Sequence, residues 1–281
     1  MKICGVTISN PDKELYTEPS VTKGEVAQYY QKIASRMLPY IRRRILSLVV
    51  CPRGIKDPCF YKKHPTDGTY CYIANVAELI AAVQNNTLEF HVWGSTIRNI
   101  DKPDIMVFDL DPDEKLSLKD VRRGVLDLNS ILDELGLVSF LKTSGNKGYH
   151  VVVPLKTTPN WESFHSFAKR VAEVIVAKWP NRYTSNVRKE NRKGKIFIDY
   201  LRNGKGATSI APYSIRAKQG ARVSMPIAWE ELDNVAPNGI TMAEAVARLS
   251  TPDPWAGFFA VMRRQGIKSG APASLARAHH E

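Results

Sequence analysis

The stretch VFDLDPDE, residues 107–114, ends an apolar run with four acidic side chains. The apolar letters predict a buried strand, and side chains alternate between the two faces of a strand. Asp109 and Asp111 therefore share one face, while Phe108 and Leu110 point into the opposite layer. Neighbouring carboxylates repel one another unless a cation lies between them. The pair predicts a site for a hard divalent cation, Mg²⁺ or Mn²⁺, at the end of this strand.

This acidic stretch has three other interpretations. A turn that caps the next helix accounts for Asp113 and Glu114 better than for the two preceding Asp residues. An EF-hand loop starting at Asp109 needs Gly at its sixth position and usually Glu at its twelfth, where the chain has Glu114 and Asp120. A haloacid-dehalogenase phosphatase also begins its site with Asp-x-Asp, but later needs a Gly-Asp or Asp-Asp pair that this sequence lacks. The phosphatase stays open as an alternative.

The stretch SFLKTSGNKGYHVVVPL, residues 139–155, predicts two strands joined by a glycine-rich turn. Its glycines let the backbone approach a ligand and present N–H groups to it, and Ser144, Lys147 and His150 add side-chain donors. These groups suit a triphosphate. The same letters are acceptable in a plain hairpin turn, and their spacing is not that of a Walker A loop.

A third acidic position, Asp199, interrupts the apolar strand KIFIDYLR, residues 195–202. If buried, such a carboxylate must be paired, hydrogen-bonded or bound to a metal. Arg202, Arg216 and Lys218 follow on loops. The chain has 40 Lys and Arg against 28 Asp and Glu, which favours a polyanionic partner, although a solvated basic surface explains part of the excess. Three carboxylates for two divalent ions, a donor-rich turn and basic loops are together what a nucleotidyltransferase requires.

The remaining pattern predicts one α+β domain over residues 1–250, with a small N-terminal lobe at about 1–65 and a loosely held tail at 251–281. Helices are predicted to begin at the capping residues Thr22, Asn75, Ser117 and Asn160. Further strands are predicted at LSLVVC (46–51), TYCYIA (69–74) and LEFHVWG (88–94).

The four cysteines, Cys4, Cys51, Cys59 and Cys71, show no C-x-x-C spacing. Three of them could gather round zinc with His64, but the spacings match no common zinc site, so we expect isolated, mostly buried thiols. No secretory signal is recognisable, and no apolar run approaches the roughly 20 residues needed to cross a bilayer. We expect a soluble protein of the cytoplasm, acting in the nucleoid and not at a membrane.

The order FDLDP, TSGNKGYHVVVPL, IFIDYLRNGKGATSIAPYSIRA closely resembles the polymerase domain of bacterial ligase D. These are archaeo-eukaryotic primase-like polymerases of non-homologous end joining. The likeness runs from about Ile8 to Leu232 and includes NPDKELY, TKGEVAQYY, LSLVVCP, CFYKKH and LEFHVWGS. It implies a primase-polymerase fold, in which helices flank a central, mostly antiparallel sheet.

The resemblance also implies roles for individual residues. It makes Asp109, Asp111 and Asp199 the metal-binding catalytic residues. It places His91, Ser144, Lys147, His150, Arg202, Arg216 and Lys218 around the nucleotide, Asn10, Lys13 and Lys23 around a downstream 5′-phosphate, and Phe60 and Tyr61 against the template bases. From the residues alone, Phe60 and Tyr61 could be core aromatics, His91 a satisfied strand histidine, and the two lysines ordinary surface residues. Tyr61, Asn146 and Val50 depart from the family pattern, where Phe, Gly or Ser, and Arg are usual.

The implied activity is the filling of short gaps at double-strand breaks, by adding nucleotides to a 3′-hydroxyl with two divalent ions, manganese preferred. The resemblance further implies a preference for ribonucleotides, work beside the Ku end-binding protein and a DNA ligase, and a monomer or a DNA-mediated dimer. No ligase nucleotidyl-lysine motif is present, so we expect a stand-alone protein or an excised domain. A non-catalytic module that bridges DNA ends is the main alternative.

Overall fold

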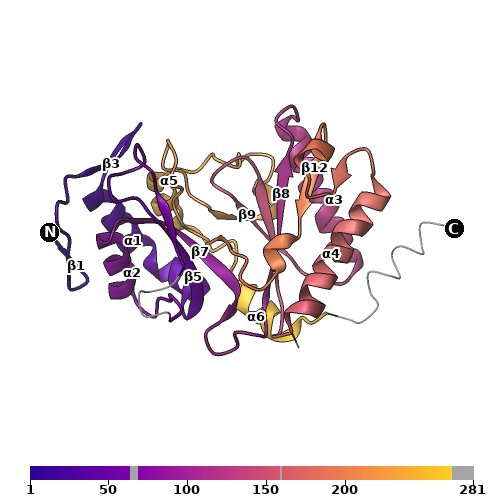
Figure 1. Cartoon of the computed structure of the whole chain (residues 1–281), viewed down its shortest axis with the longest axis horizontal. Coiled ribbons are helices and arrows are strands. Elements are labelled where there is room, and N and C mark those ends of the chain that lie inside the picture. The colour runs from indigo at the N-terminus through magenta and orange to yellow at the C-terminus, as the bar shows by residue number, and fades with distance from the viewer. Residues whose placement is uncertain (64–68, 159, 268–281) are drawn as a thin grey trace.

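The computed structural model describes residues 1–63, 69–158 and 160–267. The strands form two main sheets, of six and four strands, and two short two-stranded ribbons. Each main sheet carries its own pair of helices, and Figure 1 shows the four-stranded sheet on the N-terminal side of the molecule and the six-stranded sheet on the other side. The predicted α+β class is confirmed.

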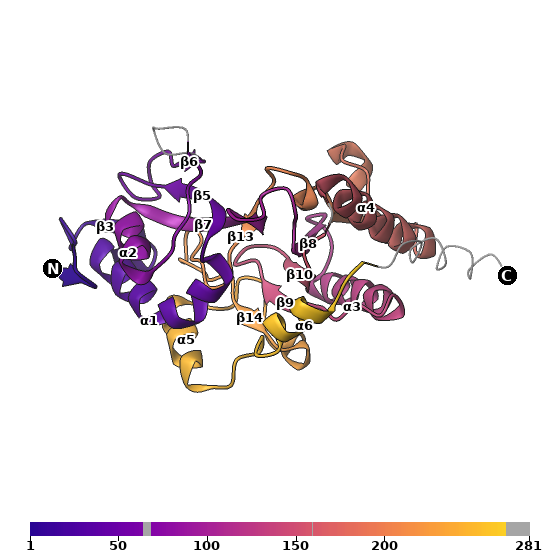
Figure 2. The same ribbon diagram turned by 90° about the horizontal axis from the view of Figure 1, so that it is seen from below.

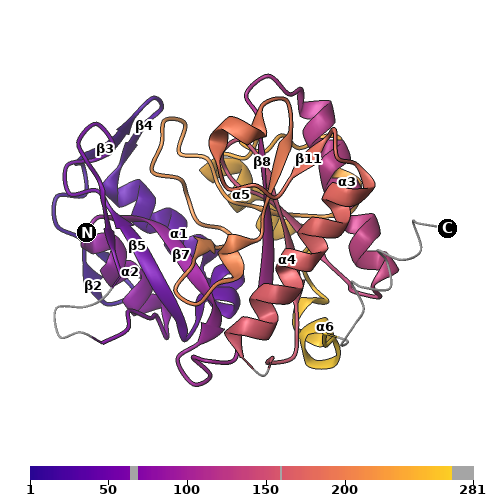
Figure 3. The ribbon, with the colours of Figure 1, turned by 45° about the vertical axis from the view of Figure 1, so that its right-hand side comes forward.

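The six-stranded sheet is antiparallel except for its first pair. Its strands, in spatial order, are β11 (Tyr183–Thr184), β12 (Ile196–Asp199), β8 (Ile105–Pro112), β10 (Tyr149–Pro154), β9 (Phe140–Thr143) and β14 (Pro226–Ile227). Figure 3 shows α3 (Leu118–Glu134) and α4 (Trp161–Lys178) running side by side over this sheet. Leu128 and Ile131 of α3 and Phe164 and Val171 of α4 are fully buried, so apolar helix faces cover the sheet.

The four-stranded sheet has the order β13 (Ser209–Ile210), β7 (Thr87–Thr96), β5 (Arg44–Val50) and β6 (Phe60–Lys62). The helices α1 (Lys23–Ile41) and α2 (Val76–Gln84) pack with it, and the ribbons β1 (Lys2–Ile3) with β2 (Val6–Thr7) and β3 (Glu14–Thr17) with β4 (Ser20–Thr22) precede α1. This sheet extends beyond the N-terminal lobe predicted over residues 1–65, because β7 and the distant β13 complete it. Figure 2 shows β6 at its outer edge.

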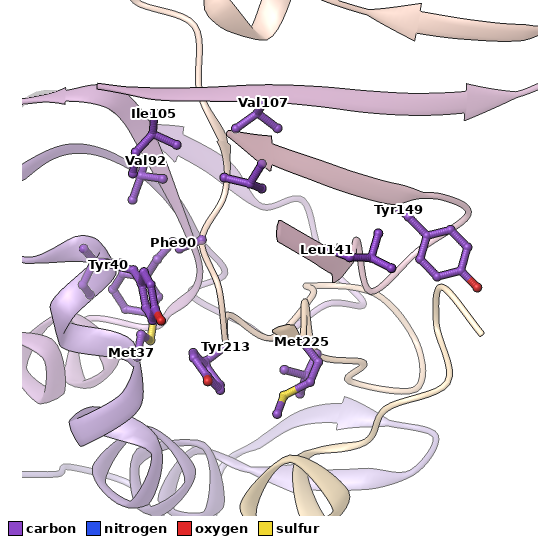
Figure 4. Close-up of a cluster of buried hydrophobic side chains, with 14 of the residues drawn as sticks. Met37, Tyr40, Phe90, Val92, Ile105, Val107, Leu141, Tyr149, Tyr213 and Met225 are labelled. Atoms are coloured by element: carbon purple, nitrogen blue, oxygen red, sulfur yellow. The ribbon is translucent and has the colours of Figure 1, made fainter. Parts of the chain in front are cut away.

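A shared apolar core joins the two sheets. Phe90 and Val92 of β7 lie near Ile105 and Val107 of β8, and Figure 4 shows these side chains together with Tyr40 of α1. Alternation along each strand sends the intervening side chains to the other face. For β7 those side chains are Glu89 and His91. In β8, Asp109 and Asp111 instead continue on the same face as Ile105 and Val107, where burial decreases toward the end of the strand. The core therefore fixes which way the polar residues point.

The C-terminal segment packs against the shared apolar core. It contains α5 (Met242–Ala247) and α6 (Phe258–Arg264). Trp255 and Phe258 are buried, and the Trp255 Nε1–H donates to the Leu141 carbonyl at 2.8 Å. The prediction of a loosely held tail is wrong for residues 251–267, because their buried aromatic side chains hold this segment against the core despite its Pro and Gly residues. Residues 268–281 lie outside the described part.

Local sequence signals had mixed outcomes. The capping boxes at Thr22 and Ser117 and the side-chain caps at Asn75 and Asn160 are confirmed, as is the hairpin of β9 and β10. The strand predicted at residues 69–74 is wrong: β6 occupies the edge of β5, and only Ile73 forms an isolated bridge, with Arg42. No helix of the described residues is long and apolar enough to span a membrane.

The cysteine prediction is also wrong in part. Cys51 and Cys59 form a disulfide, because Val50 and Phe60 pair across β5 and β6 and their neighbours meet at the end of that ladder. Cys4 is exposed and Cys71 is half-buried, both as free thiols. A zinc site using the paired cysteines is excluded, and His64 lies outside the described residues.

Candidate active site

Three carboxylates meet where β8 and β12 run side by side. Asp199 is the direct cross-strand partner of Asp109, and Asp111 follows two residues later on the same face. One oxygen from each of the three lies within 4.8 Å of the others. The predicted convergence of Asp109, Asp111 and Asp199 is confirmed, and its cause is the strand register.

Burial and mutual repulsion both act on this acidic cluster. Burial, and next the neighbouring Asp111 charge, raises the pKa of Asp109 to about 7. Burial and Asp199 also raise the pKa of Asp111. A cluster that holds a proton near neutral pH is one in which a divalent cation can replace that proton. All the ligand atoms of this cluster are carboxylate oxygens, which suit a hard cation such as Mg²⁺ or Mn²⁺. The three carboxylates could hold such ions.

A guanidinium and an imidazole border the acidic cluster; burial lowers the pKa of the His150 imidazole well below its usual value, so it is neutral. Arg202 Nε lies 3.1 Å from Asp199 Oδ2 and 3.8 Å from Asp109 Oδ2. His150 Nε2 lies 3.5 Å from Asp109 Oδ1, and His150 Nδ1 has no hydrogen-bond partner among the described residues. Both residues were predicted near the nucleotide, and the structure brings both to the cluster.

The cluster forms part of the wall of a cavity of about 500 Å³. The residues predicted around the nucleotide that line it are His91, Ser144, Lys147, His150, Arg202 and Arg216, together with Asp109 and Asp111. Tyr61 of β6 and Lys63, just after that strand, also line it. Lys218 is exposed and does not line this cavity, because its loop turns away after Arg216. A cavity of this size suits a small polar ligand such as a nucleotide.

The glycine-rich turn of residues 144–148 packs directly on the acidic strand. A Cβ added to Gly148 would lie 2.3 Å from the Leu110 carbonyl oxygen, so only glycine fits there. The backbone N–H groups of Asn146 and Gly148 donate to Ser144 Oγ, at 3.2 and 3.3 Å. The Gly145 N–H donates to the Pro237 carbonyl at 2.9 Å, so the N–H groups of both predicted glycines are already paired within the protein, and side chains such as Lys147 remain to contact an anion.

Residues 22–255 match the family model described as LigD, primase-polymerase domain. The chain belongs to this family. It is 35% identical to the multifunctional non-homologous end joining protein LigD of Pseudomonas aeruginosa, over 93% of this chain and 34% of that protein. It is 33% identical to a LigD of Mycobacterium tuberculosis, over 87% of this chain and 36% of that protein. The chain thus spans about a third of the length of these curated relatives.

A solved structure shares the fold. The polymerase domain of Mycobacterium tuberculosis ligase D, in complex with DNA, superimposes with a TM-score of 0.83 at 29% identity, over 91% of this chain and 98% of that one. As a LigD polymerase domain, the chain is a nucleotidyltransferase of non-homologous end joining. The phosphatase, the EF-hand and the non-catalytic bridging module are accordingly wrong interpretations; at Asp109 the structure also has a strand where an EF-hand needs a helix.

The residues predicted to bind a 5′-phosphate lie together at the start of α1 in this LigD polymerase domain. The Lys23 N–H donates to the Lys13 carbonyl at 2.8 Å, and Lys13 Nζ donates to the Pro52 carbonyl. Lys23 is buried; burial, and then the charge of Lys13, lowers its pKa. Asn10 is exposed in the preceding turn, with a φ of 48°. Two crowded lysines are not ordinary surface residues, and an anion would relieve their repulsion.

The aromatic pair of β6 faces solvent. Phe60 is 51% exposed and Tyr61 is 62% exposed, so the core interpretation of both is wrong. The Tyr61 ring meets the His91 ring edge-on, with centroids 5.8 Å apart. The pair thus extends from the cavity wall onto an open surface.

Two buried charged residues beside the cavity escaped prediction, Glu89 of β7 and Lys142 of β9. Lys142 is the cross-strand neighbour of His150, and its Nζ donates to Ser224 Oγ at 2.7 Å. Burial lowers the pKa of Lys142 well below its usual value, while Asp109 favours its charged form. The signal that could have revealed both residues is the one used for Asp199, a charged letter inside an apolar strand.

Proposed function

We propose that this chain is the gap-filling polymerase of bacterial end joining, adding nucleotides to a 3′-hydroxyl at breaks and short gaps. The observation that carries the proposal is the convergence of Asp109, Asp111 and Asp199 on a cavity lined by cationic side chains. The match to a polymerase domain in complex with DNA supports DNA as the substrate. A preference for ribonucleotides, and work with Ku and a ligase in the nucleoid, rest on the family resemblance.

Each part of the cavity takes a distinct role in this proposal. Two divalent ions held by the three carboxylates would align the 3′-hydroxyl and neutralise charge on the phosphate under attack. Arg202, Arg216 and Lys147 bind the phosphates of the nucleotide, and Ser144 and His150 orient them. Lys218 lies outside the cavity, where it can contact only a longer ligand such as the DNA strand.

The DNA contacts lie on the four-stranded sheet and at the start of α1. Phe60 and Tyr61 stack on template bases, which tolerates any sequence at a broken end. Lys13, Lys23 and Asn10 receive the 5′-phosphate of the downstream strand, where the crowded lysines supply the charge.

Primer extension on a gapped duplex tests the proposed activity. With Mn²⁺, the protein should extend the 3′-end when each ribonucleotide or deoxyribonucleotide is supplied separately, and ribonucleotides should be used more efficiently. No extension with any nucleotide would overturn the polymerase assignment. Equal use of both nucleotide types would overturn only the sugar preference.

The same duplex, with or without a 5′-phosphate at the gap, tests the phosphate site. The Lys23→Gln variant should lose about tenfold of its affinity for the phosphorylated duplex and little for the 5′-hydroxyl duplex, because it loses a charged hydrogen bond. Lys32→Gln, at an exposed position of the same helix, is the matched control and should keep the preference. Wild-type protein that binds both duplexes equally would remove the 5′-phosphate assignment.

A further inference from the structure

One buried carboxylate connects two walls of the nucleotide cavity. Glu89 Oε2 lies 2.7 Å from His91 Nε2, and Glu89 Oε1 accepts the Ala217 N–H at 2.7 Å and lies 3.4 Å from Arg216 Nε. The Glu89 side chain is only 5% exposed and does not line the cavity, whereas His91 and Arg216 both do. Glu89 therefore cannot meet a nucleotide itself, yet it contacts two side chains that can.

From this geometry we propose that Glu89 is a positioning residue for nucleotide binding, which orients His91 and Arg216 toward the ligand. The inference rests on the proposed polymerase function and deepens it. It assigns a task to a charged residue that the chemistry of the three aspartates leaves unused.

The strand places Glu89 and His91 on one face. They are two residues apart in β7, and the intervening Phe90 is buried in the core shown in Figure 4. His91 is also the cross-strand partner of Ile210 in β13, from which the chain leads to Arg216. Because β13 pairs with β7, the loop that follows β13 and carries Arg216 begins beside the strand that carries Glu89.

Arg216 links this strand to the glycine-rich turn on the other sheet. A Cβ added to Gly145 would lie 2.7 Å from Arg216 Cγ, so the aliphatic stem of Arg216 rests against the turn. Gly145 itself has a φ of +69°, which also favours glycine. Arg216 Nε is buried and has no hydrogen-bond partner in the described structure, although Glu89 lies nearby. A guanidinium held by charge and packing, with donors to spare, is suited to bind a phosphate.

The Glu89 contact also sets which nitrogen of His91 faces a ligand. Burial lowers the pKa of His91, so its imidazole is neutral near pH 7 and donates its single N–H, on Nε2, to Glu89. The other nitrogen, Nδ1, is then a hydrogen-bond acceptor. An acceptor in this cavity suits a hydroxyl group, such as those of a nucleotide sugar.

Glu89 remains ionised despite its burial. Burial alone would raise the pKa of Glu89, but the His91 hydrogen bond and the charge of Arg216 bring it below its usual value. A carboxylate that is charged at neutral pH, accepts a backbone N–H and neutralises one cation is a stable anchor.

Steady-state gap filling with Glu89→Gln tests the inference. Gln has nearly the same shape and still accepts the Ala217 N–H, but it loses the charge that holds Arg216 and need not fix the His91 tautomer. The nucleotide KM should rise about tenfold, while the KM for gapped DNA stays unchanged and kcat falls less than about threefold. The Glu89→Asp variant, which keeps the charge on a shorter stem, should give an intermediate nucleotide KM. Glu230→Gln, at an exposed position away from the cavity, is the matched control.

A double-mutant cycle with Arg216→Met separates positioning from general damage. If Glu89 acts through Arg216, the Glu89→Gln change should cost less in the Arg216→Met background than in wild type. A nucleotide KM equal to wild type in both Glu89 variants, or fully multiplicative effects in the double variant, would overturn the inference. Wild-type protein that extends nothing would instead overturn the proposed function, so the two failures are distinguishable.

Discussion

Asp109 and Asp199 lie on β8 and β12, inner strands of the six-stranded sheet, whereas Phe60 and Tyr61 lie on β6, the edge strand of the other sheet. Asp109 and Asp199 are largely buried and are fixed by strand register, whereas Asp111 is exposed at the end of β8. More than half of each aromatic side chain is exposed. After the roles proposed above, we call the three aspartates the catalytic floor and the β6 aromatic pair the DNA-facing edge. In this proposal, chemistry that needs fixed atoms lies where every strand has two neighbours, and contacts that must accept any base lie on an open edge.

The largest loss of activity should come from a substitution in the catalytic floor. Asp109→Asn removes one charge without changing shape and should lower extension at least about a thousandfold, since each tenfold costs about 1.4 kcal/mol and a metal site contributes several. Binding to gapped DNA should stay within a few-fold of wild type, because the floor does not carry the duplex. Primer extension and a fluorescence binding titration measure the two quantities.

The matched control for this substitution is Asp113→Asn. Asp113 follows the same strand but is not part of the acidic cluster, and its Oδ1 accepts the Lys115 N–H. Its activity should remain close to wild type. Extension by Asp109→Asn above a hundredth of the wild-type rate would contradict the role of the floor.

A second test asks whether the catalytic floor is a metal site, by thermal unfolding with and without Mn²⁺. At a hundred times its dissociation constant the ion should stabilise the fold by about 2.7 kcal/mol, which is several degrees in Tm for a domain of this size. Because the pKa of Asp109 is raised to about 7, its proton stabilises the metal-free fold as pH falls below 7 and competes with the ion. The rise in Tm on adding Mn²⁺ should therefore be larger at pH 8 than at pH 5.5.

Taking the difference with and without Mn²⁺ at each pH cancels the titration of groups remote from the floor. A chelator should reverse the shift, and Asp199→Asn should reduce it. Equal Mn²⁺ shifts at the two pH values would mean that the ion binds elsewhere.

The DNA-facing edge should respond in the opposite way to the floor. Tyr61→Ala or Phe60→Ala should weaken binding to a duplex with a template overhang by about tenfold, since one base stacked on an aromatic ring contributes about 1–3 kcal/mol. The Tm should hardly change, because these side chains are exposed. Tyr61→Phe keeps the ring and should bind like wild type, and Tyr72→Ala, at another exposed tyrosine, should have no effect. Loss of stability instead of binding would show that the ring belongs to the fold.

The same contrast explains what the sequence could predict. Alternation placed Asp109 and Asp111 on one face, and capping letters located the helix starts at Thr22 and Ser117, because these signals lie within a few residues. Asp199 was connected with the first pair because a carboxylate inside an apolar strand needs a partner, and the likeness to a known family supported that grouping. The strand pairing itself, between residues far apart, leaves no local pattern.

The failures have the same origin. Trp255 is buried by contacts with β9 and α1, and no residue near Trp255 in the sequence indicates those contacts. The Cys51–Cys59 disulfide depends on the pairing of β5 with β6, and Glu89 has a partner, Arg216, that is remote in the chain. Pairing between elements, not local preference, decided each of these, even for the disulfide, whose two strands follow one another in the chain.

The smallest expected effect lies at the rim between floor and edge. Lys147 Nζ lies 2.8 Å from Glu114 Oε1, and both side chains are mostly exposed. Each partner shifts the other: the pKa of Glu114 is lowered and that of Lys147 is raised, first by their hydrogen bond. Exposed pairs contribute little to stability, so Glu114→Gln should leave the Tm unchanged. However, a nucleotide must draw Lys147 away from Glu114, so this variant should lower the nucleotide KM by about twofold. This decrease in KM should vanish at high salt, because salt screens the exposed pair in wild type as well. A decrease that persists at high salt would mean that Glu114 hinders nucleotide binding by some route other than its pairing with Lys147.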